Sequence, residues 1–177
     1  MIRVVLGPLE AAAASAILRP VTAEWDAVTA ATRRLEVVAG PSVAEQCARL
    51  GELPVGSAVI TAAGDLPVQF LVHAVVRSTG EAVSSGGVRR ALQNGLRRLA
   101  EWGIDSVALP PLGTGAGNLD AEESAQTMLP VIVEHMRNSD HPSTVDIVVD
   151  SEYERTAFER AVAMHDVPEP IDDLPSL

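Results

Sequence analysis

The residues best suited to chemistry form a glycine-rich run late in the chain, Gly113-Thr114-Gly115-Ala116-Gly117, which is followed by Asn118. Three glycines in five positions allow positive φ angles and let backbone amides approach an anion without side chains in the way. The apolar run Ser106 to Leu109 precedes this loop as a strand, and Asp120 follows it as a helix cap. A strand, a glycine loop and a helix start in this order favour phosphate binding, with a hydroxyl donor from Thr114.

Two better-known phosphate loops do not fit this segment. A Walker loop needs Gly-Lys-Ser/Thr, and the chain contains no lysine at all. A Rossmann fingerprint has a different glycine spacing and lies early in its domain. The plain alternative is a tight strand-to-helix turn that binds nothing, and the glycines alone do not decide between these two interpretations.

Short apolar runs alternate with helical patterns along the chain, which predicts an α/β fold with a sheet covered by helices on both faces. Such short uninterrupted runs are typical of strands that are buried on both sides. The expected strands are Ile2 to Leu6, Ala16 to Leu18, Ser57 to Ile60, Phe70 to Val76, Ser106 to Leu109 and Val145 to Val149.

Periodicity and capping signals predict three helices. The first is amphipathic and runs from Val88 to Trp102, with arginines away from its apolar face. The second begins at Asp120, and Pro130 is expected to kink or interrupt it. The third begins with a capping box at Ser151. Its expected apolar face consists of Tyr153, Ala157, Ala161 and Met164.

Composition restricts the classes of partner. The formal net charge of -11 predicts no non-specific binding to nucleic acid and no attraction to anionic lipid, because both require a basic surface. An anionic ligand must therefore be held by local groups. No stretch approaches about 20 uncharged apolar residues, so no membrane span is expected.

The length of 177 residues fits one module, which we expect over residues 1–165. The acidic, proline-rich end over residues 166–177 is expected to be a flexible tail. The single cysteine, Cys47, excludes an intrachain disulfide and indicates a cytoplasmic protein. Arg3 and the small residues Ala11 to Ala16 loosely imitate a signal peptide, but Glu10 and the short apolar run favour a buried first strand.

Histidine is a common general base, and His73 lies inside the apolar run Phe70 to Val76. In that setting it is more often a core residue whose ring nitrogens are hydrogen-bonded. His135, His141 and His165 show neither metal-ligand spacing nor a nearby cysteine, so neither a metal nor a cofactor is expected.

The run Ser106 to Gly115, Ser-Val-Ala-Leu-Pro-Pro-Leu-Gly-Thr-Gly, resembles the second phosphate-binding loop of the macro-domain family. The segments Gly56 to Thr61 and Val72 to Val75 are similar to paired central strands of that family. The resemblance implies a three-layer α/β/α sandwich with a mixed, mostly parallel central sheet. It also implies a small-molecule ligand, ADP-ribose or a related nucleotide diphosphate, and it adds ADP-ribosylated proteins to the candidate partners.

Four positions depart from the family pattern. Pro8 stands where the family carries an acidic residue that recognises adenine, and Arg19-Pro20-Val21-Thr22 replaces its Asn-Ala-Ala-Asn segment. Ala27 to Leu35 contains no glycine where a first glycine-rich loop is expected, and Gly117 replaces an aromatic ring. We therefore assign no catalytic residue.

Thr22 remains a candidate ligand residue on the diverged side, together with Arg19 and Arg33, which are weighed against ordinary solvated arginines. Three hypotheses follow. The chain is a divergent macro domain that binds ADP-ribose or a relative through the glycine-rich loop. Alternatively, it is an active ADP-ribosyl hydrolase or O-acetyl-ADP-ribose deacetylase, or an interaction module whose groove is filled by its own side chains.

Overall fold

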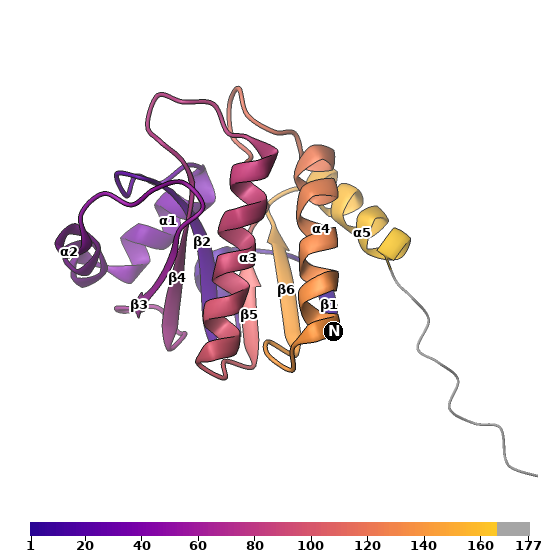
Figure 1. Cartoon of the computed structure of the whole chain (residues 1–177), viewed down its shortest axis with the longest axis horizontal. Coiled ribbons are helices and arrows are strands. Elements are labelled where there is room, and N and C mark those ends of the chain that lie inside the picture. Colours follow the sequence, from indigo (N-terminus) through magenta and orange to yellow (C-terminus); the bar gives the residue numbers. More distant parts are fainter. Residues whose placement is uncertain (166–177) are drawn as a thin grey trace, which may run out of the picture.

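The computed structural model describes residues 1–165, and a six-stranded sheet runs through their centre (Figure 1). The strands lie in the order β1-β6-β5-β2-β4-β3, and every neighbouring pair is parallel except β3 with β4. The expected tail over residues 166–177 lies outside the described residues. The strand bounds are β1 (Ile2–Leu6), β2 (Ala16–Thr22), β3 (Ala58–Ala62), β4 (Phe70–Arg77), β5 (Ser106–Leu109) and β6 (Thr144–Val149).

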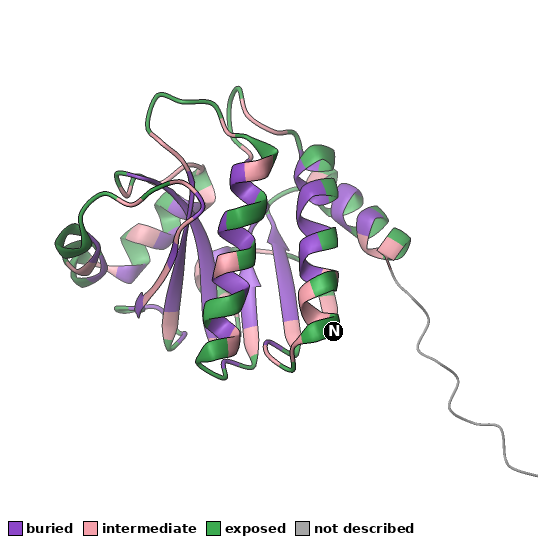
Figure 2. Cartoon of the chain, in the orientation of Figure 1, coloured by how far each residue is buried: buried purple, intermediate pink, exposed green. Residues whose placement is uncertain are grey.

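Helices cover both faces of this sheet, which gives the three-layer α/β/α sandwich that the resemblance implies (Figure 1). On one face lie α3 (Ser85–Glu101), α4 (Ala121–Asn138) and α5 (Glu152–His165). On the other lie the short 3-10 helix η1 (Leu9–Ala11), α1 (Ala30–Ala39) and α2 (Pro41–Leu50). Figure 2 shows that the front helices α3 and α4 are buried where they face the sheet and exposed elsewhere.

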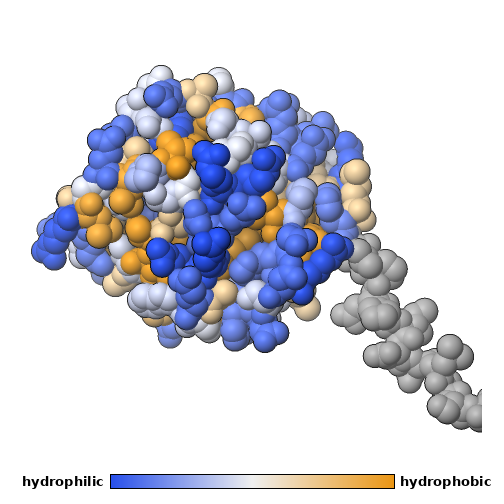
Figure 3. Space-filling view, in the orientation of Figure 1, coloured by the Kyte–Doolittle hydropathy of each residue, from blue (hydrophilic) through white to orange (hydrophobic). Residues whose placement is uncertain are grey.

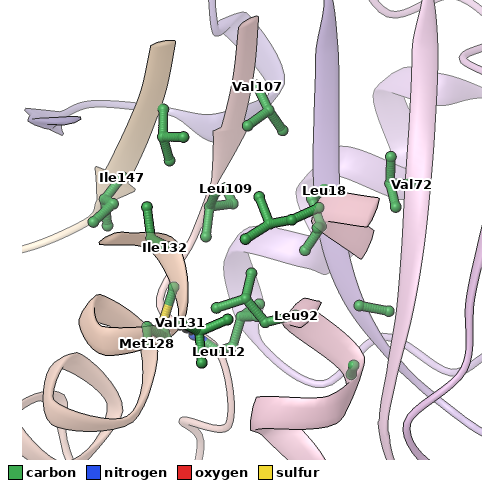
Figure 4. Close-up of a cluster of buried hydrophobic side chains, with 14 of the residues drawn as sticks. Leu18, Val72, Leu92, Val107, Leu109, Leu112, Met128, Val131, Ile132 and Ile147 are labelled. Atoms are coloured by element: carbon green, nitrogen blue, oxygen red, sulfur yellow. Dashed lines mark hydrogen bonds between the residues drawn. The ribbon is translucent and has the colours of Figure 1, made fainter. Parts of the chain in front are cut away.

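Strand β2 separates two apolar clusters. Leu18 belongs to the same cluster as Leu92, Leu109 and Ile132 beneath α3 and α4 (Figure 4), whereas the neighbouring Ile17 belongs to the cluster on the opposite face. This alternation follows from the period of a strand, in which successive side chains point to opposite faces. Burial of a large aliphatic side chain stabilises a fold by about 1.5–3 kcal/mol, so the two clusters together fix the strand ends that carry the loops.

The second strand is longer than expected, because β2 continues beyond Leu18 to Thr22. The sequence does not predict this continuation, because arginine and proline, here Arg19 and Pro20, are both unusual in a central strand. β2 pairs with β4 along its length, but with β5 only through its first two residues. On the β5 side there is no ladder for Pro20 to interrupt, because the pairing of β2 with β5 ends at Ile17, well before the carboxyl end of β2.

The expectation that Pro130 interrupts the helix after Asp120 is wrong, because α4 continues through this residue. Leu129, Val131 and Ile132 around it are buried in the core. Their packing offsets the loss of the one backbone hydrogen bond that proline removes.

The expected apolar face of the last helix is also wrong in part. Tyr153 is 63% and Met164 is 77% exposed, and the buried face of α5 consists of Ala157, Phe158 and Ala161. Phe158 is fully buried in the core beneath this helix. The helix is therefore rotated so that Phe158, rather than Tyr153 or Met164, faces the sheet.

The helices α1 and α2 lie where no helix is expected from apolar periodicity, since only three and two of their residues are buried. Local signals for them exist. Thr29 and Thr32 form a capping box at the start of α1, and Gly40 followed by Pro41 marks the end of α1 and the start of α2.

Seen from the side of α3 and α4, hydrophilic side chains predominate over α3 (Figure 3). Its arginines Arg89, Arg90, Arg97 and Arg98 are exposed, as the amphipathic pattern predicts. Within residues 1–165, no helix combines the length and the apolar character needed to cross a membrane.

Candidate functional site

The connections that leave β2 and β5 pass to opposite faces of the sheet, to α1 and α4 respectively. At such a switch point, an open α/β sheet leaves a crevice at the carboxyl ends of its strands, where ligands bind. A groove of about 500 Å³ lies at these strand ends. Its walls come from four segments that follow parallel strands: Val28 to Arg33 after β2, Arg77 at the end of β4, Pro110 to Asn118 after β5, and Val148 to Glu154 around the end of β6.

The glycine-rich loop forms one wall of the groove. Its three glycines have φ angles of 80°, 123° and 78°, which L side chains rarely adopt. The amides of Asn118 and Leu119 donate to carbonyls earlier in the loop at 3.1 and 3.0 Å. The amides of Thr114, Ala116 and Gly117 make no hydrogen bond within the described part of the chain. The turn is thus closed at its base, and its tip keeps backbone donors for an anion.

The start of α1 forms another wall. The glycine-rich loop approaches it closely, because a Cβ atom on Gly115 would lie 3.2 Å from the carbonyl oxygen of Val28. Thr29 caps α1, and Ala30 and Ala31 are its first helical residues in the groove wall. First-turn amides carry the positive end of the helix dipole, which favours a negatively charged neighbour. A helix N-terminus, whose dipole suits an anion, therefore stands where the family's first glycine-rich loop is missing.

Strand β5 and helix α4 anchor the glycine-rich loop. The amide of Leu112 donates to the Met128 sulfur at 3.2 Å, and the Ser124 hydroxyl donates to the Leu112 carbonyl at 2.7 Å. The start of α4 is occupied by a capping box, in which Asp120 accepts from the Glu123 amide at 2.8 Å and Glu123 accepts from the Asp120 amide at 2.9 Å. The α4 terminus is therefore stabilised by its own carboxylates, and the groove borders on α1 instead.

We predict that Asp120→Ala lowers the free energy of unfolding by about 1 kcal/mol, because it removes an N-cap acceptor from α4. Urea denaturation of the variant measures this change. Asp140→Ala, in the turn after α4, is the matched control for loss of a carboxylate. Equal unfolding midpoints for the Asp120 variant and the unmodified chain would contradict the capping role.

The groove has a basic end and an acidic end. Arg77, the last residue of β4, donates from Nη1 to the Glu81 carbonyl at 3.3 Å, while its buried Nε has no partner among residues 1–165. At the other end, β5 and β2 separate β6 from β4, and Asp150 comes directly after β6. Asp150 and Glu154 both line the groove there. Arg34 pairs with Asp150 at 2.9 Å. Arg77 therefore brings a positive charge to one end of the groove wall, and such a charge strengthens hydrogen bonds to ligand oxygens.

The predicted ligand residues do not all lie in the groove wall. Thr114, Gly115, Ala116 and Asn118 line it. Gly113 does not, because it packs beside Val88 and Leu119, where a Cβ atom would lie 2.7 and 2.9 Å from their side chains. Gly117 faces open space at the tip of the loop. These assignments as ligand residues stay predictions.

Thr22 is buried and is not part of the groove wall. Its hydroxyl accepts from the Asp26 amide at 3.0 Å and lies 3.4 Å from the hydroxyl of Thr79. Thr79 also donates from its amide and its hydroxyl to Glu24, and these hydrogen bonds lower the pKa of the Glu24 carboxyl. The cluster holds the connection between β2 and α1 in place, and a direct ligand role for Thr22 stays a prediction.

Three other candidates are placed clearly. His73 is confirmed as a core histidine, since it is fully buried and both ring nitrogens are hydrogen-bonded. Arg33 lies in the groove wall. Arg19 is neither solvated nor in the groove, but buried beneath α1 and α2. Sequence reasoning missed Arg77 and Asp150, for which the one signal is that each comes directly after an expected strand.

Comparison with known proteins identifies the family. The model of the macro domain matches residues 30–128. An uncharacterised protein of Aeropyrum pernix is 32% identical over 127 residues, which are 71% of this chain and 67% of that protein. An O-acetyl-ADP-ribose deacetylase of Escherichia coli is 32% identical over 128 residues, with 69% of this chain and 72% of that protein covered. The chain belongs to the macro-domain family.

One relative is much longer, and one similar structure contains a nucleotide. The chain spans 28% of an uncharacterised Mycobacterium tuberculosis protein that is 30% identical over 100 residues. A solved macrodomain of Oceanobacillus iheyensis with ADP has a TM-score of 0.83 and 19% identity, and the match covers 91% of this chain and 89% of that one. The structural likeness extends over nearly the whole described fold.

Proposed function

We propose that the groove binds ADP-ribose or a related nucleotide diphosphate, with the diphosphate between the tip of the glycine-rich loop and the start of α1. The observation that carries this proposal is the set of unbonded amides at Thr114 and Ala116, which line an open groove of about 500 Å³, with the unbonded amide of Gly117 next to them in the loop. Backbone amides and a helix N-terminus are a general binding site for phosphate. The ADP in the Oceanobacillus iheyensis macrodomain and the substrate in the name of the Escherichia coli relative support the same ligand class.

The groove makes this proposal stronger than the interaction-module hypothesis. That hypothesis expects the protein's own side chains to fill the site, whereas the wall contains the small residues Ala30, Ala31, Gly115 and Ala116. A small side chain leaves room for a ligand to approach the backbone. The described residues thus favour an open ligand-binding groove over a groove that is filled by the protein's own side chains.

The acidic end of the groove suits the base of the nucleotide. Pro8 offers no acceptor for an exocyclic amino group, but the carboxylates of Asp150 and Glu154 lie in the groove wall. Carboxylate oxygens accept hydrogen bonds from amino groups. We place the adenine near Asp150 and Glu154, and the distal ribose toward Arg77.

Isothermal titration calorimetry with ADP-ribose tests the proposal. We expect saturable binding with a dissociation constant below 1 mM, an affinity that corresponds to about 4 kcal/mol or more. ADP is expected to bind in competition with ADP-ribose. The absence of both heat and thermal shift with millimolar ADP-ribose and ADP would overturn the proposal.

We predict that Arg77→Met weakens ADP-ribose binding about tenfold or more, because a hydrogen bond to a charged group contributes about 1.5–3 kcal/mol. Arg77 lines the groove and brings a guanidinium to the end at which we place the distal ribose. Arg89→Met, on the exposed side of α3, is the matched control and should bind like the unmodified chain. Equal affinities for the two variants would remove Arg77 from the site.

A second candidate function is hydrolysis of an ADP-ribosyl bond or of O-acetyl-ADP-ribose, favoured by the name of the Escherichia coli relative. No catalytic residue is assigned, because the family's asparagines are replaced by Arg19 and Thr22. Incubation with O-acetyl-ADP-ribose and with a mono-ADP-ribosylated protein should release ADP-ribose. A flat time course at high protein concentration would exclude this function while leaving binding intact.

The same proposal extends to cellular context. An ADP-ribosylated protein is the expected macromolecular partner, and a cytoplasmic location agrees with the single buried Cys47. We also propose that residues 1–165 act as one macro-domain module. Pull-down with ADP-ribosylated and unmodified forms of the same protein tests the partner class, and equal capture of the two forms would exclude it.

A further inference from the structure

A second cavity lies on the opposite side of α1, between α1, α2 and the strands β2 and β4. Its volume is about 240 Å³, and it shares no lining residue with the groove. Most of its wall is apolar, with Leu35, Ala39, Val43 and Leu71 among the lining residues. The indole of Trp25 also lines the cavity. Such a cavity favours a ligand that is itself mainly apolar.

The cavity contains one buried charged side chain. Arg19 is 2% exposed, and it reaches the cavity from the middle of β2. Its Nε donates to His73 Nδ1 at 2.8 Å, its Nη1 donates to Glu36, and its Nη2 lies 4.0 Å from the sulfur of Cys47. The guanidinium is therefore held firmly on one side, and the remaining donors are oriented by these contacts.

Arg19 has more donors than acceptors around it. A guanidinium carries five N–H groups, and three of them are used by His73, Glu36 and Cys47. For the other two, one on each Nη, residues 1–165 supply no acceptor. Buried donors without partners cost free energy, so an oxygen atom inside the cavity would be stabilising.

The charges around Arg19 favour a neutral oxygen over a carboxylate. Glu36 already compensates the guanidinium. His73 adds no positive charge, because burial, followed by the charge of Arg19, holds its pKa well below the ordinary value of 6.5. Burial also raises the pKa of the Cys47 thiol. The exposed Glu24 beside the cavity adds a negative charge that opposes the entry of an anion.

The size of the cavity limits the ligand to about one ring. An apolar cavity of about 150 Å³ holds benzene, so about 240 Å³ accommodates a ring with one small substituent. We propose that this cavity is a binding site for neutral single-ring compounds that carry a carbonyl group. The carbonyl oxygen accepts from the free N–H groups of Arg19, and the ring packs against the apolar side chains of α1 and α2.

Benzamide is a suitable probe, and binding is followed in ¹⁵N–¹H spectra of the protein saturated with ADP-ribose or ADP, which keeps the groove occupied. We expect saturable shifts at the Trp25 indole and at α1 and α2 residues around the cavity. Toluene, which lacks the acceptor, and benzoate, which is charged, should each bind at least tenfold more weakly. Equal binding of toluene would overturn the role of Arg19, and tighter binding of benzoate would overturn the charge argument.

A blocking variant locates the site. Ala44 is exposed and lines the cavity, whereas Glu45 is exposed on the same helix and does not line it. Ala44→Trp should abolish the benzamide shifts, and Glu45→Trp should retain them. Benzamide binding that survives Ala44→Trp, or no binding of benzamide up to its solubility limit, would overturn the proposal. Neither outcome bears on ADP-ribose binding, which is measured separately at the groove.

Discussion

Ala116→Glu is expected to abolish ADP-ribose binding, with a loss of at least about 100-fold. Ala116 lines the groove at the tip of the glycine-rich loop, and its amide is one of the three without a partner. A carboxylate at this position would lie beside the bound diphosphate, and apposition of like charges in a binding site costs several kcal/mol. A loss of about 100-fold corresponds to about 2.7 kcal/mol, so the expected effect lies within that range.

This substitution separates binding from folding better than a change at a neighbouring glycine. Gly115 has a φ angle of 123° and would bring a Cβ atom to 3.2 Å from the Val28 carbonyl, so a side chain there also strains the loop. Ala116 is exposed and already carries a Cβ atom. Ala13→Glu, in an exposed segment away from the groove, adds the same charge and should bind normally. Undiminished affinity in the Ala116 variant, with an unchanged melting temperature, would place the ligand elsewhere.

The glycine-rich loop could be predicted from sequence because everything that makes it is local. A buried strand, three glycines and the Asp120 cap lie within fifteen residues, and each has a direct backbone consequence. The sheet could be predicted for the same reason, since short apolar runs mark each strand. The family resemblance then added the arrangement of these elements as a three-layer α/β/α sandwich.

The rest of the groove could not be predicted in this way, because it depends on contacts between distant segments. Arg77 and Asp150 line opposite ends of one groove only because β4 and β6 lie on either side of β2 and β5. The start of α1 was hidden for another reason. The helix buries only three residues, so it has little apolar periodicity. Its capping box also has Thr32 at the third helical position, where glutamate or glutamine is usual.

Arg19 shows why a single departure from a family pattern is hard to interpret. A charged residue in place of an asparagine suggests a new ligand contact, and solvation is the ordinary alternative. In the structure Arg19 lies neither in the groove nor in solvent, because β2 continues through it and turns its side chain into the core beneath α1. His73, Glu36 and Cys47 come from three other elements, and no spacing in the sequence indicates that they meet at one guanidinium.

This cluster predicts a pH-dependent stability. Nδ1 of His73 accepts from Arg19, so it must be unprotonated, and burial together with the neighbouring charge lowers the His73 pKa in the folded state. In the unfolded chain, histidine takes up a proton near pH 6.5. Below that pH the unfolded state binds one more proton than the folded state, so stability falls as the pH falls. The expected contribution is about 1.4 kcal/mol per pH unit until the lower folded-state pKa is reached.

Urea denaturation between pH 7.5 and pH 5.5 measures this contribution, and it avoids the range below 4.5 in which Glu24 titrates. His73→Gln should remove it, because an amide can accept from Arg19 and donate to Thr61 without binding a proton. The decisive quantity is the change in the free energy of unfolding between pH 7.5 and pH 5.5. An overall loss of stability in the variant therefore does not obscure the result. His165→Gln, near the end of α5, should leave that difference as it is in the unmodified chain. An equal pH dependence with and without His73 would mean that the folded protein protonates this histidine, and the buried cluster would then need a different arrangement of hydrogen bonds.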